Sequence, residues 1–170
     1  LMMDEKTMYT TAIKELVEAK KYARSKLTIL LEEYIEEAID KKSLTEELIE
    51  SVYGDFEGFS IRYQPQIEHG SFKLVGVEAL MRYKSLSGKN YSPAEFLPLM
   101  EQAGLMGEAS LWILKNAIAK VKEWREKIHN LRLNVNFSFL ILEEKIEEII
   151  KIFKESGLPS KTLTIELIET

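Results

Sequence analysis

Residues 132–168 read RLNVNFSFLILEEKIEEIIKIFKESGLPSKTLTIELI, and this stretch decides the fold. It opens with an alternating segment typical of a strand, residues 132–139, and closes with a second one, residues 163–168. Between them, residues 142–156 have the three-to-four spacing of an amphipathic helix, which Gly157 ends. A strand, a helix and a strand in succession predict two parallel strands joined by a crossover helix.

Two features upstream extend this pattern. Residues 92–95, Ser-Pro-Ala-Glu, have the N-cap, the first-turn proline and the capping-box glutamate of a helix start, and a long amphipathic helix is predicted over about 108–128. Before them, the strand-like segments 59–67 and 72–82 are separated by the turn 69–71, which is too short for a crossover and requires an antiparallel pair. We therefore predict an α/β fold, either an open sheet or part of a (β/α) barrel, that begins with an antiparallel pair.

The amino-terminal segment is rich in Glu and Lys and differs in character. Residues 8–42 are predicted to be helical almost throughout, and capping-box spacing at 43–46 predicts a new, short helix that runs to Val52. We expect a helical linker or signalling segment over 1–52 and an α/β domain over 53–170. For the first part, a solvated linker and a helix that pairs with a second copy both remain open.

Composition excludes several classes of protein. A content of 45% hydrophobic and 30% charged residues is typical of a globular domain, and no apolar run is long enough to span a membrane. The absence of Cys excludes disulfides, thiolate zinc sites and Cys nucleophiles, and it suits a reducing cytoplasm. The net charge of −5, without a basic stretch, argues against a nucleic-acid polymer as partner.

Polar side chains share one face of the predicted sheet. Because side chains alternate along a strand, polar residues lie opposite the aliphatic residues of their own strands: Glu78 in the second strand, Asn134, Asn136 and Ser138 in the third, and Thr164 and Glu166 in the fourth. A carboxylate turned into a sheet is costly unless a cation or strong donors compensate it, so a shared metal site is one explanation. Oxygen ligands without His or Cys favour a hard ion, Mg²⁺ or Mn²⁺. Unrelated polar residues that face solvent on a half-covered sheet are the alternative.

Two further polar residues lie near this face. Arg82 shares the face of Glu78 and carries a guanidinium fork suited to a phosphate group, although a surface ion pair explains it equally well. Gln64, in the first strand, either reaches the same ligand through its amide or is simply exposed. His69 and His129 are predicted to be surface residues, and the sequence has no glycine-rich phosphate loop.

Five motifs share their order and spacing with those of a known family. They read YQP at 63–65, VEALMRY at 77–83, PAEFLP at 93–98, NVNFS at 134–138 and TIELIET at 164–170. In this order they resemble the successive motifs of the EAL domain. The resemblance covers about residues 56–170. It implies a modified (β/α)₈, TIM-like barrel with an antiparallel first strand, and a bacterial enzyme that hydrolyses cyclic-di-GMP to linear pGpG with a pair of Mg²⁺ or Mn²⁺ ions.

The resemblance also implies roles for individual residues. The residues similar to the family's metal ligands are Glu78, Asn136 and Glu166. The residues similar to those that contact the cyclic dinucleotide are Gln64, Leu80 and Arg82, the last through a phosphate. Glu169 resembles the glutamate that steadies a loop near the metal and the dimer contact, and it completes a catalytic set with Glu78 and Glu166.

Departures from the family pattern limit these expectations. Tyr83 stands where the family usually has Trp, and Ile168 where it usually has Thr, but neither resembles a metal ligand. The family's remaining metal aspartates, its lysine and its last glutamate and glutamine belong to strands that would follow Thr170. We therefore expect these residues to be the amino-terminal half of an EAL domain, to be inactive alone, and to form a homo-oligomer through the open barrel edge or the amino-terminal helix.

Two alternatives to an enzyme remain at this point. One is a catalytically silent, EAL-type receptor for cyclic-di-GMP, and the other is a dimerising signalling module. The amino-terminal residues 19–27, AKKYARSKL, weakly resemble the end of a GGDEF domain. A generic signalling helix explains them as well.

Overall fold

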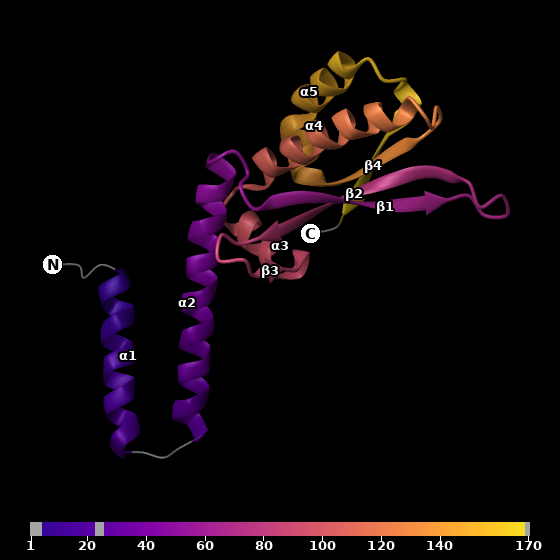
Figure 1. Ribbon diagram of the computed structural model, residues 1–170. Helices are drawn as coiled ribbons and strands as arrows, with labels where there is room; N and C mark the ends of the chain where they lie inside the picture. The colour runs from indigo at the N-terminus through magenta and orange to yellow at the C-terminus, as the bar shows by residue number, and fades with distance from the viewer. Residues whose placement is uncertain (1–4, 23–25, 169–170) are drawn as a thin grey trace. The chain divides into compact units, whose positions relative to one another are not determined.

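The computed structural model describes residues 5–22 and 26–168, and the chain divides into two compact units, Leu1–Glu46 and Glu47–Thr170 (Figure 1). The boundary falls inside one helix, α2 (Lys26–Tyr53), whose last turns belong to the second unit. The predicted functional division between 1–52 and 53–170 stays a prediction. Across 5–22 and 26–168, no helix has the length and apolar character needed to cross a bilayer.

The first unit contains helix α1 (Glu5–Tyr22) and most of α2. Lys42 lies over the ring of Tyr9, with its Nζ 5.7 Å from the ring centroid. The new helix start predicted at 43–46 is wrong, because α2 runs through these residues without a break. Thr45 instead donates its hydroxyl to the carbonyl of Lys41 at 2.8 Å, a bond that a Thr inside a helix makes. The predicted helical continuity across 23–25 lies outside the described residues.

The second unit is built on a five-stranded sheet. Its strands are β1 (Phe59–Ile67), β2 (Leu74–Lys84), β3 (Asn90–Tyr91), β4 (Arg132–Ser138) and β5 (Leu163–Ile168). The spatial order is β1-β2-β4-β5, and β3 pairs with the end of β2. β1 and β2 are antiparallel, whereas β2 with β4 and β4 with β5 are parallel. The predicted α/β alternation after an antiparallel pair is therefore confirmed.

Strand β1 lies at one edge of this sheet, as Pro65 in its middle predicts. Proline has no backbone N–H for a second ladder, so it is tolerated where only one neighbour is present. Pro65 is paired with Val77 of β2, and the register shifts one residue further on, between Gln66 and Ile67. This irregularity directly after Pro65 is typical of proline in a sheet, which is found at edges and at bulges.

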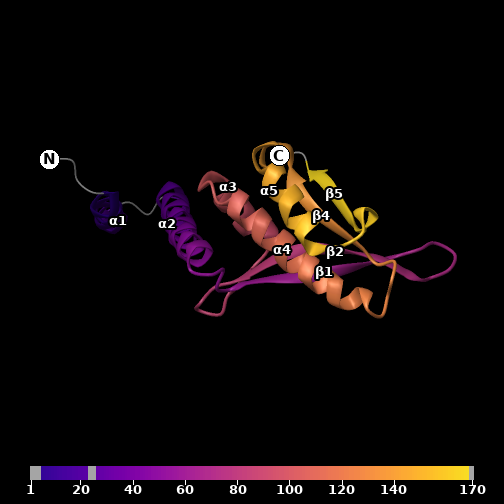
Figure 2. The same cartoon turned by 90° about the horizontal axis from the view of Figure 1, so that it is seen from above.

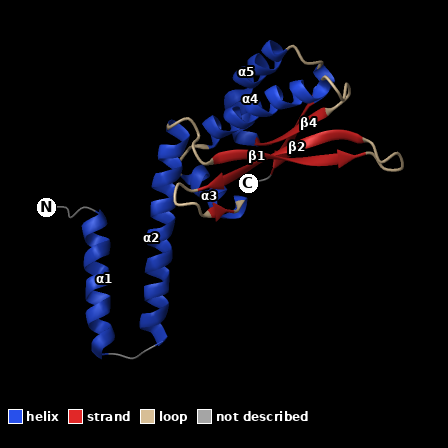
Figure 3. Ribbon diagram, viewed as in Figure 1, coloured by secondary structure: helices blue, strands red, loops and turns tan. Residues whose placement is uncertain are grey.

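Helices cover one face of the sheet. Figures 2 and 3 show α4 (Met106–Arg125) and α5 (Phe139–Ser156) lying together on the same side of the strands. The shorter α3 (Pro93–Gln102) contacts β2 and α4, and the 3₁₀ turn η1 (Ser160–Thr162) leads into β5. The buried residues of this layer include Val77, Ala79, Phe96, Met100, Leu114, Val121, Leu133, Val135, Phe137 and Ile149.

Helix α5 begins earlier than the sequence predicts. It starts at Phe139 because Ser138, the last residue of β4, serves as its N-cap with an extended backbone and accepts a hydrogen bond from the N–H of Ile141. Gly157 ends the helix in the left-handed conformation, as predicted. The strand therefore passes directly into the helix, without a connecting loop.

The predicted N-cap Ser92, first-turn Pro93 and capping-box Glu95 of α3 are confirmed, and this cap makes stability depend on pH. The Glu95 carboxylate accepts hydrogen bonds from the backbone N–H and the hydroxyl of Ser92, both at 2.7 Å. These bonds hold the pKa of Glu95 below its ordinary value. The Glu95 carboxylate therefore binds a proton more readily in the unfolded chain than in the folded one. Its contribution to the free energy of unfolding is fully present above about pH 4.3, the ordinary pKa of Glu, and is lost as pH falls through its lower, folded pKa.

Replacing Glu95 by Gln should therefore destabilise the chain at neutral pH and much less at about pH 3. Equilibrium urea unfolding at both pH values measures the difference. Glu101→Gln is the matched control, because Glu101 is an exposed carboxylate of the same helix for which no hydrogen bond is found among the described residues. If Glu95→Gln lowered the free energy of unfolding by the same amount at both pH values, this role of the carboxylate would be contradicted.

Candidate functional site

Three strands place polar side chains on the sheet face that α4 and α5 leave uncovered. In the parallel register, Glu78 of β2 is paired with Asn134 of β4, and Asn136 of β4 is paired with Glu166 of β5. Paired residues on neighbouring strands point to the same face. The register thus agrees with the predicted shared face of Glu78, Asn136 and Glu166.

Alternation along each strand fixes this arrangement. Val77 and Ala79, on either side of Glu78, are 4% and 2% exposed on the helix-covered face. Val135 and Phe137 flank Asn136 and are each 1% exposed. A slip of one residue would bring the polar groups into the core, so burial of the aliphatic face holds the site in register.

Two asparagines of β4 connect the two glutamates. Asn136 donates from its Nδ2 to Oε1 of Glu78 at 2.7 Å, and Asn134 donates from its Nδ2 to Oε1 of Glu166. Glu78, Asn136 and Glu166 are half-buried, and Asn134 is 9% exposed. The amides of β4 therefore lie between a carboxylate of β2 and a carboxylate of β5.

Asn134 is a site residue that the sequence reasoning missed. The alternation of β4 places it on the polar face of the strand, but no role is predicted for it. The signal for it is its equal parity with Asn136, which puts both amides on one face of β4. Only the register with β2 and β5 reveals which carboxylate each amide meets.

The donor set suits a hard divalent cation. Among the described residues, no three His, Cys, Asp or Glu side chains cluster closely enough to hold a metal ion. Two carboxylates with amide oxygens still fit Mg²⁺, because proteins hold this ion through one or two carboxylates, several waters and substrate phosphates. Since Asn136 donates from its nitrogen, its carbonyl oxygen remains available as a ligand.

The residues predicted to contact a ligand extend from this centre along the strands. Gln64 of β1 is directly opposite Glu78, and its side chain is exposed. Leu80 and Arg82 follow Glu78 on the same face of β2 and are half-buried. Four residues of strand separate the backbone positions of Glu78 and Arg82, a distance of about 13 Å.

The Arg82 guanidinium has a local partner. Its Nη1 donates to the carbonyl of Met81 at 2.7 Å. That bond uses one of the five N–H donors of the side chain, and the others remain for an anion. Glu169, the last predicted site residue, lies outside the described residues.

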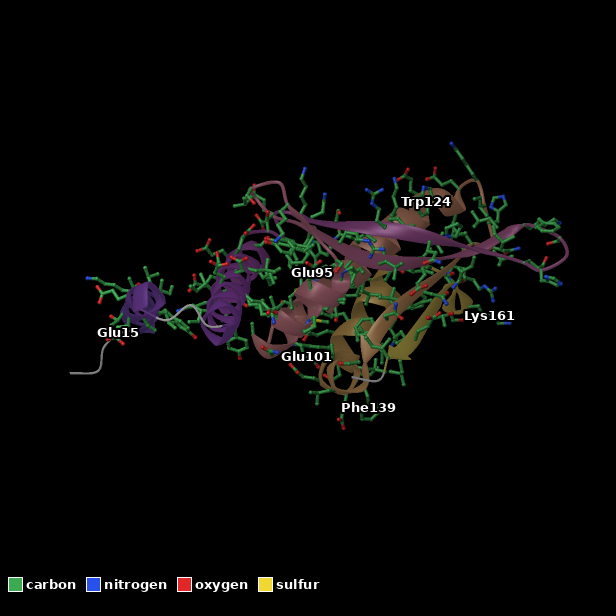
Figure 4. The ribbon with its side chains drawn as sticks, turned by 90° about the horizontal axis from the view of Figure 1, so that it is seen from below. Glu15, Glu95, Glu101, Trp124, Phe139 and Lys161 are labelled. Carbon is green, nitrogen blue, oxygen red and sulfur yellow. The ribbon has the colours of Figure 1, made fainter. Side chains whose placement is uncertain are left out.

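The lining of a cavity of about 560 Å³ includes Ser138 and Ile168, at the ends of β4 and β5. The rest of the lining comes mainly from α3, the first residues of α4 and the start of α5, and none of the predicted site residues contributes to it. Phe139, in the first turn of α5, is 66% exposed and projects away from the sheet (Figure 4). At the other end of the layer, Trp124 of α4 packs edge to face on Tyr63 of β1, with centroids 4.8 Å apart (Figure 4).

Comparison with known sequences identifies one family for the part of the chain that contains the sheet. The family description "EAL domain" matches residues 46–170. A relative named cyclic di-GMP phosphodiesterase PA2567, from Pseudomonas aeruginosa, is 35% identical over 119 residues, which are 69% of this chain and 20% of the relative. The signaling protein YkoW of Bacillus subtilis is 29% identical over an alignment of 116 residues that covers 66% of this chain and 14% of the relative.

Solved structures resemble the same part of the chain. The FimX EAL domain of Xanthomonas citri in complex with c-di-GMP matches with a TM-score of 0.64 and 25% identity, over 78% of this chain and 51% of that one. The EAL enzyme Bd1971, in a cAMP-bound form, matches with a TM-score of 0.68 and 16% identity, over 88% of this chain and 44% of that one. These matches confirm the predicted partial barrel fold. The chain spans about a fifth of the first curated relative and about half of the solved chains.

Proposed function

We propose, from the premise that this chain belongs to the EAL domain family, that the full-length protein hydrolyses cyclic-di-GMP to linear pGpG. The observation that supports this most is the alignment of Glu78, Asn134, Asn136 and Glu166 on one face of three adjacent strands. The activity serves second-messenger signalling in the bacterial cytoplasm.

The proposed metal ligands are Glu78, Asn136 and Glu166. A bound Mg²⁺ or Mn²⁺ lowers the pKa of its water and neutralises charge on the phosphodiester. The chain's own residues hold and orient the groups around it: Asn134 fixes the Glu166 carboxylate, and Asn136 contacts that of Glu78. Because these asparagines already hold the two carboxylates by hydrogen bonds, the carboxylates need little rearrangement when a metal ion binds.

The proposed ligand contacts lie on β1 and β2. Arg82 binds a phosphate through its guanidinium fork, Leu80 offers an apolar surface, and Gln64 donates or accepts through its amide. Glu169 is proposed to steady the loop that follows β5. Together these residues hold the dinucleotide so that one phosphodiester faces the two glutamates.

The described strands supply half of such a barrel. Among residues 5–22 and 26–168, β1 and β5 each pair with one neighbouring strand, so each has an open edge. Open edges favour pairing with further strands. We propose that additional strands complete the two-metal site, either from the same polypeptide or from a second copy in a homo-oligomer.

Incubation of the full-length protein with cyclic-di-GMP tests this function. Chromatography should show pGpG with Mg²⁺ or Mn²⁺ and none after chelation of the metal with EDTA. Binding of cyclic-di-GMP without turnover would contradict the hydrolase and indicate a receptor. Neither binding nor turnover would indicate a signalling module that only dimerises.

Replacement of Arg82 by Ala should weaken binding of cyclic-di-GMP by about ten- to a hundredfold, because a charge-assisted hydrogen bond to phosphate contributes roughly 1.5–3 kcal/mol. Calorimetric titration in Ca²⁺ measures binding without hydrolysis if, as we expect, Ca²⁺ occupies the site without supporting turnover. Arg132→Ala is the control, since Arg132 is exposed at the opposite, amino end of β4. Equal affinities for Arg82→Ala and Arg132→Ala would contradict the phosphate contact.

A further inference from the structure

The last turns of α2 pack into the same compact unit as the sheet. Leu48 and Val52 are 0% and 5% exposed, and the Ser51 hydroxyl donates to the carbonyl of Glu57 in the turn that precedes β1. Residues 47–53 of α2 (Lys26–Tyr53) belong to this unit. The end of α2 is therefore part of the domain that carries the site.

Glu47 of α2 holds the carboxyl end of β2 at two points. Its Oε1 accepts a hydrogen bond from the phenol of Tyr83 and another from the backbone N–H of Leu86, both at 2.8 Å. Tyr83 is near the end of β2, and Leu86 lies in the turn that follows it. A single carboxylate oxygen thus joins the helix to the strand and to its exit turn.

Tyr83 transmits this restraint because its ring is fixed. It is 2% exposed and lies against Phe59, Phe96 and Tyr91, with ring centroids 4.7, 6.0 and 6.2 Å away. Burial, and then the hydrogen bond to Glu47, raise the pKa of Tyr83, so its hydroxyl remains a donor throughout the physiological range. The phenol cannot move without disturbing the whole aromatic cluster.

The backbone beyond Tyr83 is held as firmly. The N–H of Lys84 donates to the carbonyl of Gly58 at 3.0 Å. Gly58 has a φ of 83°, and a Cβ at this position would collide with the carbonyl oxygen of Lys84. Glycine is therefore needed at position 58, where the residue before β1 lies against the last residue of β2.

Arg82 is the residue immediately before Tyr83, and side chains alternate across a strand. Tyr83 is anchored on the helix-covered face, so Arg82 is directed to the face that carries Glu78. We propose that Glu47 and Tyr83 are a positioning pair, which fixes the end of β2 so that Arg82 meets the phosphate of its ligand, and which links α2 to the site. This inference rests on the proposed binding of cyclic-di-GMP.

Four variants of the full-length protein test the pair. Tyr83→Phe removes the bond from the phenol, Glu47→Ala removes the bonds from both Tyr83 and Leu86, and Glu47→Gln retains an oxygen acceptor. Tyr91→Phe is the matched control, because Tyr91 belongs to the same aromatic cluster and its hydroxyl has no hydrogen bond among the described residues. The measurements are the Kd for cyclic-di-GMP in Ca²⁺, kcat with Mg²⁺, and hydrogen exchange of the amides of residues 82–86 without ligand.

Tyr83→Phe should speed exchange at 82–86 and raise Kd by about three- to tenfold, the effect of one net hydrogen bond. Glu47→Ala, which loses two hydrogen bonds, should have at least as large an effect on both. The value of kcat should change little, and Glu47→Gln and Tyr91→Phe should remain near wild type. Unchanged exchange, or faster exchange with unchanged Kd, would overturn the proposal. A wild type that does not bind cyclic-di-GMP contradicts the proposed function itself, and this is seen before any variant is compared.

Discussion

Replacing Glu78 by Gln is expected to lower kcat for cyclic-di-GMP hydrolysis by more than about a hundredfold. Substituting a residue that only supports a metal ligand costs roughly 10- to 100-fold in metal affinity or activity, and a ligand itself should cost more. The variant retains the size of the side chain and an oxygen atom, but it loses the negative charge that a hard cation requires. Glu166→Gln should have a similar effect.

The geometry makes these substitutions good tests of the site. The amide introduced by Glu78→Gln still has an oxygen that can accept the hydrogen bond from Asn136, so the sheet should remain folded. Hydrolysis assays across a series of Mg²⁺ concentrations separate weaker metal binding from a lower maximal rate. Glu126→Gln is the control, because it removes an exposed carboxylate at the end of α4. Wild-type kcat in Glu78→Gln would contradict the assigned role.

The largest effect on stability is expected at Phe137. This residue of β4 is 1% exposed on the face that the helices cover, and it lies next to Asn136 in the chain. Phe137→Ala should lower the free energy of unfolding by about 3–5 kcal/mol, through lost burial and the cavity that remains. Whole domains are stable by only about 5–15 kcal/mol, so a large share of the variant should be unfolded under mild denaturant.

Phe139 provides a control two residues away. It is the same residue type, but it is 66% exposed at the start of α5. Phe139→Ala should therefore change stability by less than about 0.5 kcal/mol in the same urea titration. Comparable losses of unfolding free energy for Phe137→Ala and Phe139→Ala would contradict the burial of Phe137 and the exposure of Phe139.

Hydrophobic alternation allowed much of the sheet to be predicted. The predicted ranges 59–67 and 163–168 are those of β1 and β5. Both strands alternate between apolar and polar residues over most of their length. The second strand was predicted two residues too early, over 72–82, because Phe72 is apolar; it is 84% exposed and has a φ of 54°, as expected of a turn residue.

The helix start predicted at 43–46 was wrong because a local sequence pattern was given more weight than packing of the helix. Residues 43–46 have the spacing of a capping box, but Leu44 and Leu48 continue the apolar side of α2, and both are buried. A Ser, Thr or Glu inside a helix costs only a few tenths of a kcal/mol, which burial of two leucines exceeds. Short-range spacing alone cannot show this balance.

The sequence allowed the residues of the candidate site to be predicted, but not which of their side chains contact one another. Parity along the strands placed Glu78, Asn136 and Glu166 on one face, and the register agrees with that. The role of Asn134 and the clamp of Glu47 on Tyr83 depend on contacts between residues distant in sequence. Glu169 and the metal ion stay predictions.

Anomalous diffraction from crystals of the full-length protein grown with Mn²⁺ tests the central claim most directly. The account predicts a manganese peak within about 2.0–2.6 Å of carboxylate oxygens from Glu78 and Glu166, with the Asn136 carbonyl oxygen as a further ligand. An ordered manganese ion elsewhere, with these side chains uncoordinated, would contradict it. So would the absence of any peak beside Glu78 at a Mn²⁺ concentration that supports hydrolysis.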